Sequence, residues 1–217
     1  MKKILSPSMM CADFGNLAQE IHDLETAGAD SFHLDLMDGA FVPNYGMGLQ
    51  DIQYIVSHAN VPCDVHMMSV NPGEYVEMFA KMGCGTIYIH PETDPHTPRT
   101  LQKILDSGAR AGIAVNPGTS YFAIEPLLTM AQDVLVMTVN PGFAGQKYLP
   151  FVDEKIDELL EHREKYGGYR IFIDGACSPQ VIARLSAKGV EGFVLGTSAL
   201  FGKGKPYNEL ISELRRL

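Results

Sequence analysis

The amino-acid sequence predicts one (β/α)8 barrel that occupies residues 1–217 as a single domain. Three observations support this prediction: eight short apolar runs alternate with amphipathic segments, glycines recur where a helix would end and a strand begin, and no long linker or low-complexity tract intervenes. An open doubly wound sheet also alternates strands and helices. Eight units in a chain of this length nevertheless favour a closed barrel, whose typical size is about 250 residues.

The eight apolar runs each have the length of a strand, and turn-forming residues bound them. Three of them share one entry, in which a helical pattern ends at a glycine (Gly28, Gly83 or Gly189) and the run follows. The predicted strands occupy residues 4–8, 31–36, 62–66, 86–90, 111–115, 134–139, 170–174 and 192–196.

Amphipathic patterns lie between the runs, and we expect seven or eight helices in total. Leu17, Ile21 and Leu24 recur at helical spacing, and their pattern stops at Gly28. Three other patterns begin with a proline, which suits the first turn of a helix. The clearest predicted helices occupy residues 16–27, 72–82, 151–166, 179–188 and 206–217.

Composition excludes several classes of protein. Hydrophobic residues make up 46% and charged residues 20%, as in ordinary globular proteins, and no apolar run approaches the roughly 18 residues of a membrane helix. The first residues lack the apolar stretch of a signal peptide, so we expect a cytoplasmic protein with no membrane partner. The net charge of −9 argues against nucleic-acid binding, which requires a basic face. An anionic substrate would therefore be held by local dipoles.

The four cysteines, Cys11, Cys63, Cys84 and Cys177, show no CxxC spacing. Nothing else in the sequence indicates a secreted protein. We therefore expect buried, reduced thiols.

Two histidines and two aspartates stand in or at the ends of apolar strand-like runs. His33 and Asp35 are two positions apart, so their side chains point to the same face of one strand. His66 ends the next predicted strand and Asp174 ends the seventh, and the carboxyl ends of strands form the functional face of such barrels. A lone buried histidine is usually a core residue, but burial of all four groups is costly without a shared partner. The four predict a metal site with catalytic carboxylates, which would hold one divalent ion per subunit: Zn, Mn, Fe, Co or Mg.

Three glycine-containing loops follow the last three predicted strands. Small residues let main-chain N–H groups approach an anion, and phosphate sites of barrels commonly use these loops and the start of a short helix. One such loop alone would be an ordinary turn, but three on adjacent strands favour a phosphate site. The residues are Gly142, Phe143, Ala144 and Gly145, then Gly175 and Ala176, then Gly196, Thr197 and Ser198, where we expect a short helix to begin.

Four methionines, Met10, Met37, Met68 and Met137, fall near predicted strand ends. They are consistent with flexible core filler and equally with a polarisable lining that keeps water out of the site. Asp38 precedes Gly39, so we expect it to organise a turn and not to react.

The order of these motifs resembles the ribulose-phosphate 3-epimerase family, and the resemblance runs through essentially the whole chain. The motifs that carry it are Ser6-Pro7-Ser8, His33-Leu34-Asp35-Leu36-Met37-Asp38-Gly39, Phe41-Val42-Pro43-Asn44, Asp64-Val65-His66-Met67, Met137-Thr138-Val139-Asn140-Pro141-Gly142-Phe143 and Asp174-Gly175.

The resemblance implies a TIM barrel of the ribulose-phosphate-binding type that epimerises a ketose phosphate at C3. His33, Asp35, His66 and Asp174 would hold the metal, and the metal would stabilise an enediolate. Asp35 and Asp174, on strands that we expect on opposite sides of the barrel, would be the two acid/base groups that remove and return the C3 proton. Members of the family form dimers or hexamers, so we expect a homo-oligomer.

The substrate-contact residues that the resemblance implies fall into two groups. One group lies beside the reacting carbons: Ser8, His66, Met37, Met68 and Met137. The other group comprises the three phosphate loops named above.

Four departures from the common pentose-phosphate pattern resemble the allulose-6-phosphate 3-epimerase branch: Gly142-Phe143-Ala144-Gly145, Asp174-Gly175-Ala176-Cys177, Leu195-Gly196-Thr197-Ser198-Ala199-Leu200-Phe201 and His90-Pro91-Glu92-Thr93. We therefore expect interconversion of D-allulose 6-phosphate and D-fructose 6-phosphate, with D-ribulose 5-phosphate and D-xylulose 5-phosphate as the alternative pair. More distant alternatives are a metal-dependent hydrolase and a non-catalytic sugar-phosphate-binding barrel. An aldose–ketose isomerase fits less well, because its chemistry moves hydrogen between C1 and C2.

Overall fold

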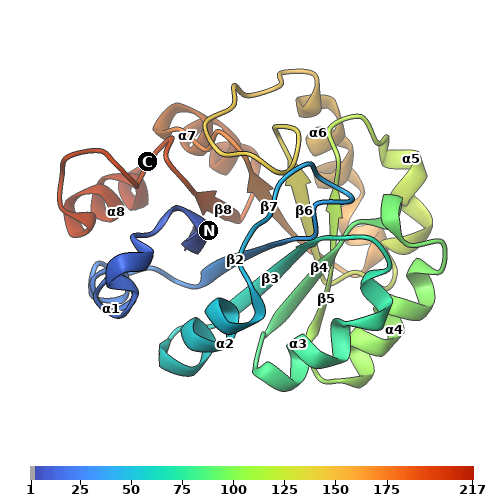
Figure 1. Ribbon diagram of the computed structural model, residues 1–217. Helices are drawn as coiled ribbons and strands as arrows, with labels where there is room; N and C mark the ends of the chain where they lie inside the picture. The colour runs from blue at the N-terminus through green and yellow to red at the C-terminus, as the bar shows by residue number, and fades with distance from the viewer. Residues whose placement is uncertain (1–2) are drawn as a thin grey trace.

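The computed structural model describes residues 3–217, so Met1 and Lys2 of the predicted domain lie outside the described part. Eight parallel strands form one sheet in the order β1-β8-β7-β6-β5-β4-β3-β2, with helices around its outer side (Figure 1), which confirms the predicted fold class. The strands are β1 Ile4–Pro7, β2 Phe32–Met37, β3 Cys63–Met68, β4 Thr86–Ile89, β5 Arg110–Val115, β6 Asp133–Met137, β7 Arg170–Asp174 and β8 Gly192–Leu195.

The two edge strands of this sheet, β1 and β2, meet where Ser8 pairs with His33 in an isolated bridge, so the barrel is nearly closed. Around the ring, only β1 and β8 stand between β2 and β7. The expectation that the second and seventh strands lie on opposite sides is therefore wrong by one strand position. Inward side chains from both strands still converge, because the lumen of an eight-stranded barrel is only wide enough for side chains to fill.

The helices follow the predicted alternation. Only α7 has the predicted bounds, and α1 and α8 are one residue shorter at each end. The α-helices are α1 Leu17–Thr26, α2 Leu49–His58, α3 Val76–Met82, α4 Thr97–Asp106, α5 Tyr121–Ile124, α6 Val152–His162, α7 Pro179–Lys188 and α8 Tyr207–Arg216. Short 3-10 turns are η1 Met9–Cys11, η2 Phe14–Asn16, η3 Pro72–Glu74, η4 Pro91–Thr93, η5 Glu125–Leu127 and η6 Arg163–Tyr166.

Three helical predictions need correction. The pattern predicted at 72–82 is a 3-10 turn followed by α3, because the backbone leaves helical geometry at Tyr75, whose φ is −118°. The pattern at 151–166 tightens into a 3-10 turn after His162 and stops at Gly167. No helix begins at Thr197: the main-chain N–H groups of Ala199, Leu200 and Phe201 all converge on the carbonyl oxygen of Gly196 as turns.

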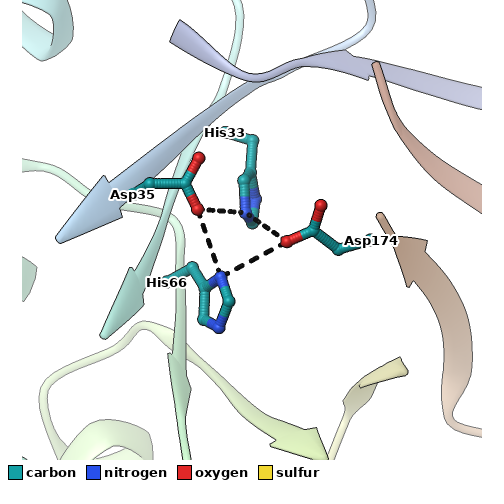
Figure 2. A group of neighbouring side chains, drawn as sticks. All are labelled: His33, Asp35, His66 and Asp174. Atoms are coloured by element: carbon teal, nitrogen blue, oxygen red, sulfur yellow. Dashed lines mark hydrogen bonds and ion pairs between the residues drawn. The ribbon is translucent and has the colours of Figure 1, made fainter. Parts of the chain in front are cut away.

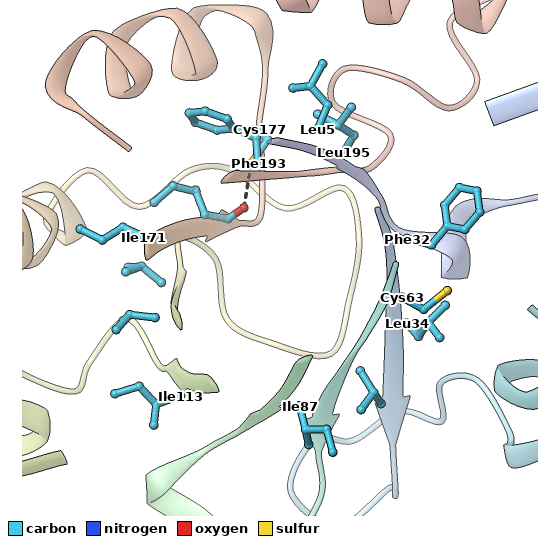
Figure 3. Packing of buried hydrophobic residues seen from close by; sticks show 14 of the residues in the cluster. Leu5, Phe32, Leu34, Cys63, Ile87, Ile113, Ile171, Cys177, Phe193 and Leu195 are labelled. Carbon is cyan, nitrogen blue, oxygen red and sulfur yellow. Dashed lines mark hydrogen bonds between the residues drawn. The ribbon is translucent and has the colours of Figure 1, made fainter. Parts of the chain in front are cut away.

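Most buried apolar residues form two layers. The outer layer fills the space between strands and helices and includes Leu34, Ile87 and Phe193, whose side chains Figure 3 shows outside the strands. The inner layer fills the lumen and depends on pairs of large and small residues: a Cβ on Gly112 would lie 2.4 Å from the Tyr88 ring, and one on Gly192 would lie 1.9 Å from the Phe172 ring. The buried apolar side chains of the inner layer are Tyr88, Ala114, Leu135, Met137, Phe172 and Val194.

An ion-pair cluster closes the end of the barrel at which the strands begin. Asp133, the fully buried first residue of β6, accepts two hydrogen bonds of 2.9 Å from Arg110 and two of 2.6 and 2.7 Å from Arg170. These arginines are the first residues of β5 and β7. One carboxylate is thus held by two bidentate guanidinium pairs.

The cysteines and the absence of a predicted membrane helix were the remaining predictions from composition. The four cysteines are all free; Cys63, Cys84 and Cys177 are buried, whereas Cys11 is partly exposed. Across residues 3–217, no helix has both the length and the apolar character needed to cross a bilayer.

Candidate active site

His33, Asp35, His66 and Asp174 converge from three strands, β2, β3 and β7, with one potential ligand atom from each lying within 4.8 Å of all the others (Figure 2). Asp35 Oδ1 lies 3.3 Å from both His33 Nε2 and His66 Nδ1. Asp174 Oδ2 lies 3.7 Å from His33 Nε2 and 3.5 Å from His66 Nδ1. Two imidazole nitrogens and two carboxylate oxygens therefore surround one point, which is a donor set suited to Zn²⁺ or a similar divalent ion.

The cluster lies deeper in the barrel than the sequence predicts. β3 continues to Met68, so His66 is two residues short of the strand end, and His33 is only the second residue of β2. Asp174 alone ends its strand. As predicted, His33 and Asp35 share the inward face of β2, because alternate strand residues point the same way.

His33 is fixed by Asp64, which is its register partner on β3. Its Nδ1 lies 2.5 Å from Asp64 Oδ1, which fixes the ring and directs Nε2 into the cluster. Within residues 3–217, Nε2 has no hydrogen-bond partner, because neither nearby carboxylate meets it in hydrogen-bond geometry. A buried, unpartnered ring nitrogen that faces two carboxylates fits a metal ligand.

Asp35 is the other strongly positioned group. Its Oδ2 accepts a hydrogen bond of 2.6 Å from the hydroxyl of Ser8, which leaves Oδ1 to face the histidines. Burial alone would raise the pKa of Asp35, but the nearby His33 imidazole and the hydrogen bond from His66 hold that pKa well below its usual value. Asp174 has a lowered pKa for the same opposing reasons, with burial raising it and both histidines lowering it further.

The histidines respond in the opposite direction. Burial disfavours their charged forms, yet Asp64, Asp35 and Asp174 raise the pKa of His33 well above its usual value. Burial also opposes the charged form of His66, but hydrogen bonds to Asp174 and Asp35 raise its pKa. The carboxylates thus stabilise positive charge at this point, which a bound divalent cation would supply.

The outer nitrogen of His66 leads into a second set of contacts. His66 Nε2 lies 2.9 Å from His90 Nε2, and His90 Nδ1 lies 3.3 Å from Glu92 Oε2. Burial lowers the pKa of His90 to about 4, so its ring is neutral. Burial opposes ionisation of Glu92, but hydrogen bonds from His90, Thr119 and Asn116 lower its pKa to about 2.

A pocket opens above the cluster at the carboxyl ends of the strands. All but one of the residues predicted to contact substrate line it; the exception is His66, which is fully buried beneath it. The lining residues among them are Ser8, Met37, Met68, Met137, Gly142, Phe143, Ala144, Gly145, Gly175, Ala176, Gly196, Thr197 and Ser198.

The pocket wall made by the last three loops is built mainly from main chain and small side chains. Gly175 has a φ of 108°, and a Cβ there would lie 2.5 Å from Val139 Cγ2, so only glycine fits. Ala176 adopts a φ of 49°, which is uncommon for a residue with a side chain. Gln146 braces the loop after β6 by donating to the carbonyl oxygens of Asn140 and Phe143.

The opposite wall is apolar. Met37 and Met68 pack with Val42, and the partly buried Met10 and Phe41 join this cluster. All four methionines named from the sequence line the pocket, which is the lining arrangement and not core filler alone.

The segment between β2 and α2 is tied across the mouth of the pocket. Asn44 Nδ2 donates to the carbonyl oxygen of Gly142 at 2.7 Å. Asp38 organises this turn as predicted, accepting from the main-chain N–H groups of Ala40, Phe41 and Val70.

The sequence did not identify Asp64 or Glu92 as contributors to the site. Asp64 was detectable in principle, since it stands two positions before His66 and so shares its strand face. Glu92 lies on a 3-10 turn after β4, where no strand or helix periodicity indicates the direction of a side chain.

Comparisons with known proteins show what the whole chain is similar to. The model of a family described as "Ribulose-phosphate 3 epimerase family" matches residues 4–201. A ribulose-phosphate 3-epimerase of Aquifex aeolicus is 40% identical, with 92% of this chain and 90% of the relative covered, and one of Bacillus subtilis is 38% identical with 97% of each covered. Among solved structures, KGPDC from Streptococcus mutans has a TM-score of 0.70 at 10% identity, covering 100% of this chain and 99% of that one. That identity is low enough that this last likeness speaks for the fold alone.

Proposed function

The chain belongs to the ribulose-phosphate 3-epimerase family, a family of carbohydrate isomerases, and from this premise we propose that it interconverts D-ribulose 5-phosphate and D-xylulose 5-phosphate. The relatives reported above match over nearly their whole length and carry that name. They favour the five-carbon substrate pair over the six-carbon pair that four local sequence details suggested. Those details are small substitutions in loops, where sequences vary most within a family.

One observation carries the proposal of chemistry: two carboxylates on different strands reach the same point as two histidine nitrogens, inside a pocket. Epimerisation at C3 requires a base on one face of a flat intermediate and an acid on the other. Asp35 from β2 and Asp174 from β7 are the two groups in the described chain that we assign to these roles.

The same residues suit a divalent metal. The unpartnered Nε2 of His33 and the low carboxylate pKa values fit such an ion, which His33, Asp35, His66 and Asp174 would hold. A bound divalent cation supplies positive charge that stabilises negative charge developing on the ketone oxygen.

The chain's own residues perform the remaining tasks. Asp35, kept ionised and held by Ser8, removes the C3 proton, and Asp174 delivers a proton from the other face; in the reverse direction they exchange roles. Met37, Met68 and Met137 exclude water from the intermediate. Main-chain N–H groups at Gly175, Ala176 and Gly196, with the hydroxyls of Thr197 and Ser198, bind the phosphate.

A side-by-side kinetic comparison tests the proposal. The purified protein, with its metal content assayed, is given ribulose 5-phosphate and allulose 6-phosphate at equal concentrations. We expect kcat/KM to favour the pentose by roughly tenfold or more, as is typical when a pocket must accept one additional carbon unit. A preference for the hexose would return the assignment to the six-carbon pair.

A second measurement separates epimerisation from the other chemistries. In deuterated water, the proposed mechanism incorporates deuterium at C3 of the ketose phosphate. A hydrolase or a non-catalytic binding barrel would leave C3 unlabelled, and an aldose–ketose isomerase would label C1 or C2.

A further inference from the structure

The two histidines of the cluster are supported differently on their outer sides. His33 is bonded directly to a carboxylate, Asp64. His66 meets a second imidazole, that of His90, which is fully buried and lies between His66 and Glu92. A contact between two imidazole nitrogens requires one to donate and the other to accept, so the proton position on one ring determines the proton position on the other.

Glu92 sets which nitrogens donate and which accept in this row of hydrogen bonds. Glu92 Oε1 accepts from the main-chain N–H of Asn116 at 3.0 Å and from the hydroxyl of Thr119 at 2.5 Å, so Oε2 is left to face His90. An ionised carboxylate only accepts, and His90 Nδ1 must therefore donate. His90 Nε2 is then an acceptor, and the proton of His66 lies on Nε2. His66 Nδ1, which contacts Asp35 Oδ1 at 3.3 Å and lies 3.5 Å from Asp174 Oδ2, is consequently the nitrogen left to bind a cation in place of a proton.

We propose that His90 and Glu92 are positioning residues that fix the proton of His66 on Nε2 and thereby keep its Nδ1 free for a metal ion. The inference rests on the proposed role of His66 as a ligand but not on the identity of the sugar. Phe41 packs against His90 with ring centroids 4.8 Å apart, and the centroids of His66 and His90 are 5.1 Å apart, so neighbouring rings hold His90 in this orientation.

The substitution Glu92→Gln tests these donor and acceptor roles with almost no change in the shape of the side chain. The N–H of Asn116 still needs an acceptor, so the amide oxygen of the new side chain takes the place of Oε1 and its NH₂ group faces His90. His90 Nδ1 then accepts, His90 Nε2 donates, and the proton of His66 is forced onto Nδ1. Metal binding at His66 Nδ1 would require every donor and acceptor in this row of hydrogen bonds to exchange roles.

Glu92→Ala removes the same charge without imposing a direction. We expect Zn²⁺ affinity, measured by competition with a chelator, to fall roughly 10- to 100-fold in Glu92→Gln and by less than about tenfold in Glu92→Ala. A residue that merely packs or supplies charge would give the opposite order, because the isosteric change would be the milder one. Thr119→Val is the matched control: it removes one donor to Oε1, leaves the direction of the chain intact and should bind Zn²⁺ almost as the unaltered protein does.

The second readout needs neither metal nor substrate. Ring ¹⁵N–¹H correlation spectra of the metal-free protein should place a proton on Nε2 of His66, and that proton should be absent in Glu92→Gln. The inference is overturned if His66 keeps its Nε2 proton in Glu92→Gln, or if Glu92→Ala binds Zn²⁺ more weakly than Glu92→Gln. Failure to turn over ribulose 5-phosphate would count against the proposed substrate and would leave both of these measurements unaffected.

Discussion

Each end of the barrel buries a cluster centred on carboxylates, and the two clusters differ in how their charge is balanced. Where the strands begin, Asp133 receives four hydrogen bonds from Arg110 and Arg170. Where they end, Asp35 and Asp174 face two imidazoles, one of which has a nitrogen without a hydrogen-bond partner in the described chain. The first cluster is complete in the protein alone, whereas the second needs positive charge from outside. Residues arranged for stability and residues arranged for chemistry are thus separated along one barrel axis, as is general for this fold.

The largest effect should follow from neutralising one acid of the incomplete cluster. Asp174→Asn keeps the shape of the side chain and removes its ability to transfer a proton, so we expect kcat to fall by at least about 10³-fold, and likewise for Asp35→Asn. The melting temperature should stay within a few degrees of that of the unaltered protein, because a buried negative charge is removed with little change in packing. Metal content must be measured in each variant, since loss of the ion would also abolish turnover. Near-normal turnover in either variant would refute the two-base scheme.

Neutralising the carboxylate at the other end of the barrel should lower stability and leave kcat unchanged. Asp133→Asn leaves two guanidinium groups without their carboxylate, and we expect a loss of about 3 kcal/mol in the free energy of unfolding by urea. This is the lower end of the usual range, because the arginines are 41% and 37% exposed and can be partly rehydrated. The kcat of the folded protein should be unchanged. A large fall in kcat with unchanged stability would erase the distinction between the two ends.

Acid pH should weaken the stabilisation that Asp133 provides, and we expect this effect to be smaller than that of the substitution. Burial would raise the pKa of Asp133, but Arg170 and Arg110 lower it below its value in the unfolded chain, which is about 3.9. The folded state therefore binds fewer protons there, so the contribution of Asp133 to stability is fully present above that value and is lost as pH falls through the folded pKa. Urea unfolding of the unaltered protein and of Asp133→Asn should converge as the pH is lowered from about 6 toward about 2. A constant difference across this range would contradict the argument.

The smallest predicted effect concerns backbone strain in the phosphate wall. Ala176 has a φ of 49°, so Ala176→Gly should stabilise the fold by about 0.5–1 kcal/mol, the relief of the left-handed conformation exceeding the entropy cost of glycine. Its N–H is retained, and KM for the phosphorylated substrate should therefore change by less than about twofold. A substantial rise in KM would indicate that the Ala176 side chain itself contacts substrate.

The sequence predicted the barrel and the four-residue cluster because both depend on strong, local patterns. Period-two alternation places His33 with Asp35, and the recurrence of strand and helix patterns places Asp174 at a strand end far along the chain. Strand ends were less accurate, since β3 runs on through Met67 and Met68, which are as apolar as the rest of the strand. The support of His66 by Glu92 was beyond prediction, because it depends on the conformation of an irregular turn.

The lumen of the barrel has a consequence for how this chain can change over evolutionary time. Residues 112 and 192 must be glycine because the rings of Tyr88 and Phe172 occupy the space that any side chain at those positions would need. Neither member of such a pair can be exchanged alone, since a larger residue at the glycine would collide with the ring and a smaller one at the ring would leave a void. Each pair should therefore covary, so that descendants carrying alanine or valine at residue 192 also carry a smaller residue at 172.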